Sequence, residues 1–167
     1  MNNMVKQLLT LNQLESGNDP LTIERFDIAK HIDELARTNR IRAQQKEAEI
    51  LYDYVKPEYV WADQFKIEEV ITNYISNAIN HVESLGGEKA YIKIWLGKAG
   101  LNDKKVRIHV FNTGKHIPEN DIDKIWDKFY KVDKARTREY GGSGVGLSIV
   151  KAIMNSHNQK CGADNVE

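Results

Sequence analysis

Four glycines occupy six positions near the end of this 167-residue chain: Gly141, Gly142, Gly144 and Gly146. Apolar residues then recur at helical spacing, so the segment predicts a stretch without side chains that runs into an amphipathic helix. The first turn of such a helix carries free N–H groups and the positive end of the helix dipole. Because glycine lets an anion approach the main chain closely, we interpret the segment as a phosphate site rather than as a flexible turn.

The familiar glycine-rich phosphate motifs do not match this segment. Gly141 and Gly146 have the spacing of a Walker loop, but Leu147 stands where the lysine belongs. The same leucine replaces the third glycine of a dinucleotide fingerprint. A protein-kinase glycine loop lies near the start of its domain, whereas this segment lies near the end of the chain. We therefore expect a different kind of phosphate site.

The charge balance and the cysteine count argue against several classes of protein. Lysine and arginine together number 24, as do aspartate and glutamate, and no long basic run is present, which disfavours a nucleic-acid-binding surface. One cysteine, Cys161, cannot form a disulfide framework and fits a reducing compartment. No apolar run reaches about 18 residues, and no signal peptide is visible. We expect a soluble chain with no nucleic-acid partner and no membrane contact of its own.

Apolar periodicity and turn residues predict a mixture of helices and strands. A first helix over residues 1–16 has leucines that need a partner, either in a longer helical element or on this domain itself. Asp27 is the predicted N-cap of a second helix. Predicted strands cover 21–26, 49–55, 59–62, 89–96 and 105–111, and predicted helices cover 27–48, 63–81 and 118–128. A last strand is expected to begin within 159–163.

The predicted helix 63–81 has a continuous apolar stripe and, beside it, Asn73, Asn77 and Asn80. Asparagine is a mediocre helix former, so three in one helix weaken it. A single helical asparagine is usually a solvated surface residue, but Asn73 and Asn77 lie one turn apart at the border of the buried face. Their amide oxygens are hard, neutral ligands that suit a Mg²⁺ ion holding waters and phosphate oxygens. We interpret the pair as residues of a ligand cleft.

Two further segments predict ligand contacts. Asn112, Thr113 and Gly114 form a polar turn at the end of a predicted strand, where binding loops commonly lie. Residues 129–140 are charged and mixed, with Lys131, Lys134, Arg136 and Arg138 among them. We interpret this segment as a lid that carries cations toward the glycine-rich segment. The alternative is an exposed loop with ordinary surface charge.

Taken in order, these segments resemble the ATP-binding catalytic domain of bacterial two-component sensor histidine kinases, which share a fold with DNA gyrase, the Hsp90 chaperones and the MutL mismatch-repair proteins. The resemblance covers nearly the whole chain. Four segments match the family's motifs: 63–82 the N box, 110–118 the first glycine box, 125–130 the F box and 142–147 the second glycine box. Each motif alone is weak, but the combination is highly specific.

The resemblance implies an α+β fold of the Bergerat type, a two-layer α/β sandwich in which helices cover one face of a mixed sheet, with a short N-terminal helix. Residues 1–18 would be the end of a dimerisation helix and its linker. Residues 19–167 would be the ATP-binding domain, with its C-terminal strand truncated. The resemblance also implies a cytoplasmic location, in the C-terminal part of a membrane-bound sensor.

The same resemblance implies roles for individual residues, with ATP and Mg²⁺ as cofactors. Asn77 would hold Mg²⁺, and Asn73 would assist the metal or the phosphates. Arg136 would approach the γ-phosphate, and residue 112 would recognise adenine beside Gly114. The nucleotide-contacting residues of the second glycine box would be Gly142, Ser143, Gly144, Val145, Gly146 and Leu147.

Three residues depart from the family's pattern. Asn112 replaces the usual aspartate that accepts a hydrogen bond from the adenine amino group. An amide oxygen can still accept that bond, and the amide NH₂ can donate to the neighbouring ring nitrogen. The lost charge assistance costs about 1 kcal/mol. His116 replaces the second glycine of the first glycine box, and Asn80 stands where a phosphate-contacting lysine is common. We expect weaker but retained adenine binding.

The family's phosphoacceptor motif, a histidine followed by an acidic residue, Leu, a basic residue, Thr and Pro, is missing. His31 resembles it only superficially, because Ile32 separates it from Asp33 and no proline stands at the motif's position. We therefore expect a histidine kinase fragment that transfers the γ-phosphoryl group of Mg-ATP to a histidine on a dimerisation domain outside this chain. A response regulator would be the parent protein's partner. An ATPase of the gyrase or Hsp90 kind is disfavoured, because those relatives place a glutamate base where Asn73 stands. A nucleotide-binding regulatory module without turnover stays open, because of Asn112 and Asn80.

Overall fold

The computed structural model describes residues 3–134 and 142–167. The chain divides into two compact units, Ile23–Lys115 and the combination of Met1–Thr22 with His116–Glu167.

The unit Ile23–Lys115 contains two sheets. Strands β1 (Ile23–Asp27) and β3 (Tyr59–Asp63) form an antiparallel pair. The larger sheet has the order β2-β4-β5, with β2 (Ala48–Leu51) parallel to β4 (Ala90–Ala99) and β4 antiparallel to β5 (Lys105–Asn112). The single-turn 3-10 helix η1 (Leu101–Asp103) lies between β4 and β5. The sheet is therefore mixed, and the predicted α+β class is confirmed.

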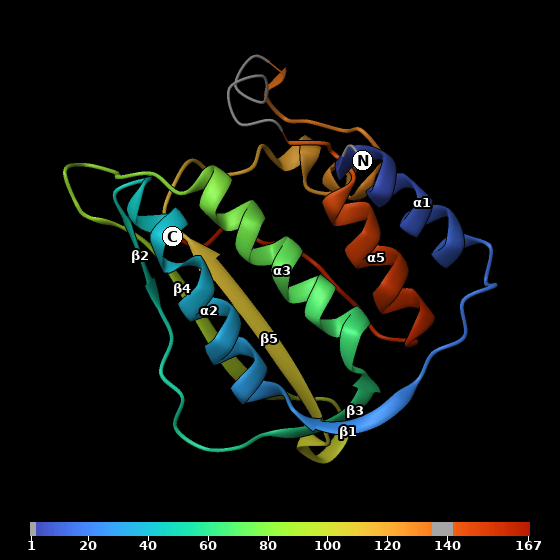
Figure 1. The fold of residues 1–167 in the computed structure, drawn as a ribbon. Helices are drawn as coiled ribbons and strands as arrows, with labels where there is room; N and C mark the ends of the chain where they lie inside the picture. Colours follow the sequence, from blue (N-terminus) through green and yellow to red (C-terminus); the bar gives the residue numbers. More distant parts are fainter. Residues whose placement is uncertain (1–2, 135–141) are drawn as a thin grey trace. The chain divides into compact units, whose positions relative to one another are not determined.

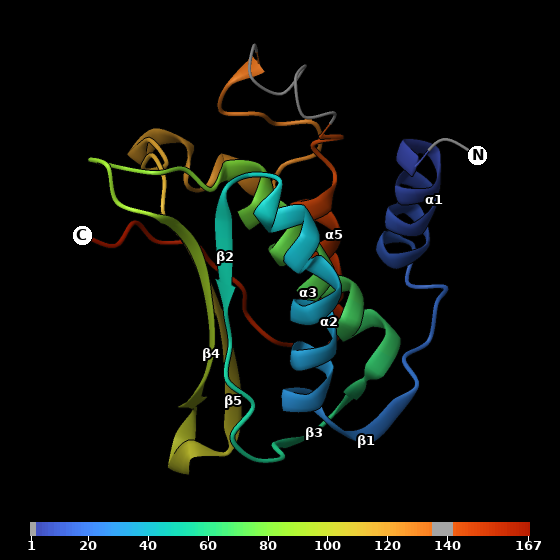
Figure 2. The same ribbon diagram turned by 60° about the vertical axis from the view of Figure 1, so that its left-hand side comes forward.

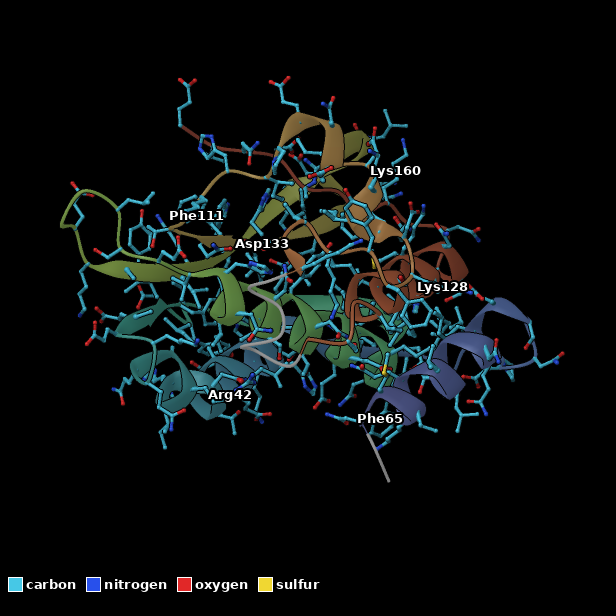
Figure 3. The ribbon with its side chains drawn as sticks, turned by 90° about the horizontal axis from the view of Figure 1, so that it is seen from above. Arg42, Phe65, Phe111, Lys128, Asp133 and Lys160 are labelled. Carbon is cyan, nitrogen blue, oxygen red and sulfur yellow. The ribbon has the colours of Figure 1, made fainter. Side chains whose placement is uncertain are left out.

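Two helices cover one face of the larger sheet. Helix α2 (Ile28–Gln44) packs against β2, and helix α3 (Gln64–His81) packs against β5, as Figures 1 and 2 show from two directions. Alternate residues of β4 point to the helices and are buried, whereas Phe111 lies on the side of the sheet opposite Arg42 of α2 (Figure 3). The largest fully buried side chains of this unit are Ile28, Ile32, Ile71, Ile75 and Ile92. Their burial holds the helices on the sheet.

Aspartate side chains start both helices. The Asp27 carboxylate accepts hydrogen bonds from the backbone N–H groups of Lys30, at 3.3 Å, and Glu58, at 3.0 Å. The buried Asp63 carboxylate accepts a hydrogen bond from the backbone N–H of Lys66 at 3.1 Å. Each aspartate satisfies a donor that the first turn of its helix leaves unpaired. The predicted cap at Asp27 is confirmed, and its bonds tie α2 to the segment before β3.

Several predicted elements differ in extent, and β4 continues to Ala99 rather than ending at residue 96. Helix α2 ends at Gln44, because Glu47 has a left-handed φ of 55° and Ala48 already begins β2. The predicted strand 49–55 is the shorter β2. The predicted helix 118–128 is two 3-10 turns, η2 (Glu119–Asp121) and η3 (Lys124–Trp126).

The strand expected to begin within 159–163 is absent from the described structure. The tail is held instead by the Asn165 side-chain amide, which accepts a hydrogen bond from the N–H of Ile117 and donates one to its carbonyl, each 2.8 Å long. One side chain thus makes the two bonds that a neighbouring strand's backbone would make.

The second unit pairs the first helix of the chain with the last. Helix α1 (Asn3–Glu15) lies beside α5 (Gly146–Ser156), and Leu11 is buried with 2% of its surface exposed (Figure 1). The Glu15 carboxylate forms an ion pair of 2.6 Å with Lys128. Helix α5 is therefore a partner for the leucines of α1. In the described ranges, none of the helices combines the length and the apolar character that crossing a bilayer requires.

We predict that Asp27→Ala lowers the free energy of unfolding by about 1 kcal/mol, because it removes the cap of α2. Burial raises the pKa of Asp27, but the hydrogen bonds from Glu58, Lys30 and Tyr54 outweigh that effect, so its pKa lies below the ordinary 3.8. The ionised carboxylate therefore stabilises the folded state above that pH, and the stabilisation is lost as the pH falls through the folded-state pKa. Urea denaturation of both proteins at neutral and acidic pH measures the difference. A gap that persists unchanged in acid would contradict the capping role.

Candidate functional site

Helix α3 carries the two asparagines that the sequence singles out, and both side chains are half-buried. The Asn73 amide nitrogen donates to the Glu69 carbonyl of the same helix at 2.9 Å, so the nitrogen is engaged within the helix. Across the part of the chain that the structure describes, the Asn77 amide has no hydrogen-bond partner. A half-buried amide without a protein partner is suited to a ligand.

Among residues 3–134 and 142–167, no group of three or more histidine, cysteine, aspartate or glutamate side chains gathers to hold a metal ion. The amide oxygen of Asn77 is a neutral oxygen donor of the kind that a metal ion at this helix would use. Mg²⁺ fits such a donor, because it commonly keeps several waters and binds through one or two protein groups together with substrate phosphates.

The turn after β5 is fixed against the end of α3. The Thr113 carbonyl accepts a hydrogen bond from the backbone N–H of Glu83 at 2.9 Å. Gly114 has a φ of 153°, and a Cβ at this position would lie 2.6 Å from the His81 carbonyl oxygen. Only glycine allows this approach. The Asn112 amide nitrogen also donates to the Thr113 carbonyl, at 3.1 Å.

In the second unit, the glycine-rich segment approaches the residues of the F box. Gly144 has a left-handed φ of 72°, and a Cβ on it would lie 3.0 Å from the Cα of Phe129. The N–H of Phe129 donates to the Gly144 carbonyl at 2.9 Å. The Lys131 ammonium donates to the Gly142 carbonyl at 2.6 Å. At least one cation of the predicted lid thus contacts the glycine-rich segment.

Helix α5 starts directly after these glycines. Its N-cap residue, Val145, is fully buried and makes no side-chain capping bond, and its own N–H donates to the Ser143 hydroxyl at 3.3 Å. The N–H groups of the turn that follows have no acceptor within the helix. Ser143 donates through its hydroxyl to the Gln7 side chain at 2.7 Å. Val145 therefore anchors the helix in the core, and a ligand here would meet main-chain groups and the Ser143 hydroxyl.

Comparison with known proteins identifies the family. Residues 62–167 match the model of the family described as histidine kinase-, DNA gyrase B- and HSP90-like ATPases. The chain belongs to this ATPase family. The match spans α3 and its asparagines, the turn after β5 and the glycine-rich segment, so the resemblance predicted from the sequence is confirmed.

Relatives within the family are sensor kinases. The chain is 33% identical over 165 residues to the sensor protein kinase WalK of Staphylococcus aureus, and this match covers 98% of the chain. It covers only 38% of that relative and 26% of WalK from the JH9 strain, so the chain spans well under half of these proteins.

Solved structures give the same fold. The catalytic domain of the histidine kinase ThkA has a TM-score of 0.71 and 27% identity, over 88% of this chain and 90% of that one. Full-length ShkA in complex with AMPPNP has a TM-score of 0.73 at 19% identity, over 93% of this chain and 30% of that chain.

The predicted site residues of this ATPase domain fall into three groups. Asn73, Asn77, Asn112 and Gly114 belong to the unit Ile23–Lys115. Residues 142–147 belong to the other unit. Arg136, the predicted γ-phosphate contact, lies outside the described residues, as does Gly141. The contact of Gln7 with the glycine-rich segment was not predicted, because the two residues are 136 positions apart and no local pattern links them.

We predict that Gly114→Ala destabilises the ATPase domain by roughly 2 kcal/mol, because a methyl group would collide with the His81 carbonyl. Gly162→Ala is the matched control, since open space surrounds Gly162, and its effect should stay within about 0.5 kcal/mol. Thermal and urea unfolding measure both. Equal stability of the two variants would show that the turn tolerates a side chain at position 114.

Proposed function

We propose that this chain is the ATP-binding catalytic domain of a sensor histidine kinase. It would bind Mg-ATP and transfer the γ-phosphoryl group to a histidine on a dimerisation domain outside these residues, from which a response regulator would receive it. The family match and the similarity to the sensor protein kinase WalK support this proposal. So does the half-buried amide of Asn77, which has no partner within the described structure.

The residues of α3 favour phosphoryl transfer over hydrolysis. Asn77 would hold Mg²⁺, which when bound would neutralise charge on the phosphates. Asn73, one turn earlier, carries an amide that cannot act as a general base for water. A histidine nitrogen needs no such base, because it is already a nucleophile when neutral. The amide at position 73 is the observation that favours transfer to histidine over ATP hydrolysis of the gyrase or HSP90 kind.

The glycine-rich segment would bind the phosphates through its main chain. The backbone N–H groups at the start of α5 and the positive end of its dipole favour an anion. Lys131 already contacts this segment, and Arg136 would add a second cation at the γ-phosphate. These groups would position the phosphates and stabilise their charge, which is the main work in phosphoryl transfer.

The similarity to sensor histidine kinases also supports a proposal for the domain organisation. Residues 1–18 would be the end of a dimerisation helix and its linker, and residues 19–167 the ATP-binding domain, in the cytoplasmic part of the parent protein.

A nucleotide-binding regulatory module without turnover is the second candidate function, because Asn112 and Asn80 replace an aspartate and a lysine common in the family.

We predict that Asn77→Ala removes the effect of Mg²⁺ on nucleotide binding. Calorimetry with a nonhydrolysable ATP analogue should show at least about tenfold tighter binding with Mg²⁺ in the wild-type chain, and nearly equal binding with and without Mg²⁺ in the variant. Thr72→Ala is the control, because Thr72 is exposed on the same helix. A variant that keeps the full Mg²⁺ effect would remove Asn77 from the metal site.

We also predict phosphoryl transfer to a histidine supplied separately. The chain is mixed with γ-labelled ATP and a dimerisation-helix hairpin from a related sensor kinase, and with the same hairpin carrying His→Ala. The expected product is an acid-labile, alkali-stable phosphohistidine on the first hairpin only. Release of free phosphate without labelling would favour an ATPase, and nucleotide binding with neither product would favour the regulatory module.

A further inference from the structure

Thr113 makes an unusual set of bonds at the point where β5 ends. Continuing the β4–β5 register places Thr113 opposite Tyr91, and the Thr113 N–H donates to the Tyr91 carbonyl at 3.0 Å, as in a regular ladder. The return bond is different. The Tyr91 N–H donates to the Thr113 hydroxyl at 3.1 Å, and not to the Thr113 carbonyl.

The Thr113 hydroxyl therefore takes the place of the Thr113 carbonyl as the acceptor for the Tyr91 N–H. In an antiparallel sheet, a hydrogen-bonded pair exchanges two N–H to carbonyl bonds. Because the side chain of Thr113 accepts one of them, its carbonyl is free to turn toward the end of α3. There it accepts hydrogen bonds from the Glu83 N–H at 2.9 Å and from the Asn112 amide nitrogen at 3.1 Å.

These bonds fix which end of the Asn112 amide faces outward. The Thr113 carbonyl is an acceptor only, so rotating the amide by half a turn would set two oxygens against each other. The nitrogen of Asn112 is thus committed to Thr113, and the oxygen is the end left for a ligand. An unrestrained asparagine would offer either end with equal ease.

We propose that Thr113 is a positioning residue: it orients the Asn112 amide so that its oxygen accepts a hydrogen bond from an exocyclic amino group on a purine. This inference rests on the proposed function, in which Asn112 lies at the base of the nucleotide. The outward oxygen accepts a hydrogen bond from the 6-amino group of adenine. Hypoxanthine and guanine carry a 6-oxo group, which would face that oxygen without a donor between them, and an unpaired acceptor is costly. The fixed amide therefore gives adenine selectivity without a carboxylate charge.

The first test needs no nucleotide. In the NMR spectrum of the wild-type chain, the Asn112 side-chain amide should exchange with solvent more slowly than that of Asn102, which is exposed. Thr113→Ser keeps the hydroxyl and should keep this protection. Thr113→Val removes the hydroxyl, so the carbonyl returns to Tyr91 and the protection is lost. Equal exchange of Asn112 and Asn102 in the wild-type chain would overturn the proposal, and that measurement does not depend on whether the valine variant folds.

The second test measures base selection by competition between ATP and ITP, which differ at the 6-position. The wild-type chain and Thr113→Ser should prefer ATP by roughly 10- to 100-fold, and Thr113→Val should bind the two nucleotides within about threefold. A loss of stability alone would weaken ATP and ITP alike and leave their ratio unchanged.

The outcomes separate this inference from the proposed function. Binding of ATP and ITP with equal affinity by the wild-type chain would overturn the role of Thr113 and leave ATP binding intact. A protected Asn112 amide without binding of either nucleotide would overturn the proposed function, and with it the contact of Asn112 with a base. A preference for ATP that survives in Thr113→Val would show that the selectivity comes from other residues.

Discussion

The approach of the turn after β5 to the end of α3 is the contact on which the rest of the unit Ile23–Lys115 depends. The His81 carbonyl lies so close to Gly114 that a single added carbon would not fit, and the Glu83 N–H is bonded to Thr113. Because α3 is a continuous helix, fixing the position of its last turn also fixes the positions of Asn73 and Asn77 relative to the sheet. The same contact sets the direction of the Thr113 carbonyl and so the orientation of Asn112.

The elements predicted best are those whose signals are local. Helix α3 has an unbroken apolar stripe and a capping aspartate, and its observed bounds, Gln64–His81, nearly coincide with the predicted 63–81. The end of α2 was placed too late because the turn that stops it uses Glu47 at positive φ, a residue that gives no turn signal. Residues 118–128 look helical by composition, but long-range bonds such as that from Ser148 to the Trp126 carbonyl hold them in shorter turns.

In the candidate site too, features with a local sequence signal could be predicted and features that depend on long-range contacts could not. Asn73, Asn77, Asn112 and the glycines could be selected from the sequence, because each residue type is poor in its element unless a ligand or a close backbone approach requires it. The bond that orients Asn112 could not be selected, because any strand end can carry a threonine. The role of Thr113 depends on whether the Tyr91 N–H donates to the Thr113 hydroxyl or to the Thr113 carbonyl, and the two residues are 22 positions apart. Spacing and composition carry no information about such a choice.

Protein groups already engage parts of the glycine-rich segment. The Ser143 hydroxyl donates to Gln7, and the Gly142 carbonyl accepts from Lys131. A phosphate that uses the Ser143 hydroxyl must replace the Gln7 bond, so the measured affinity would be the difference between the two interactions. At the start of α5, the Val145 N–H donates to the Ser143 hydroxyl at 3.3 Å, and the Val145 side chain accepts no capping bond in the described structure. Because the N–H groups of the turn that follows have no acceptor within the helix, the main chain is the part of this segment best prepared for an anion, which explains why glycines rather than polar side chains dominate it.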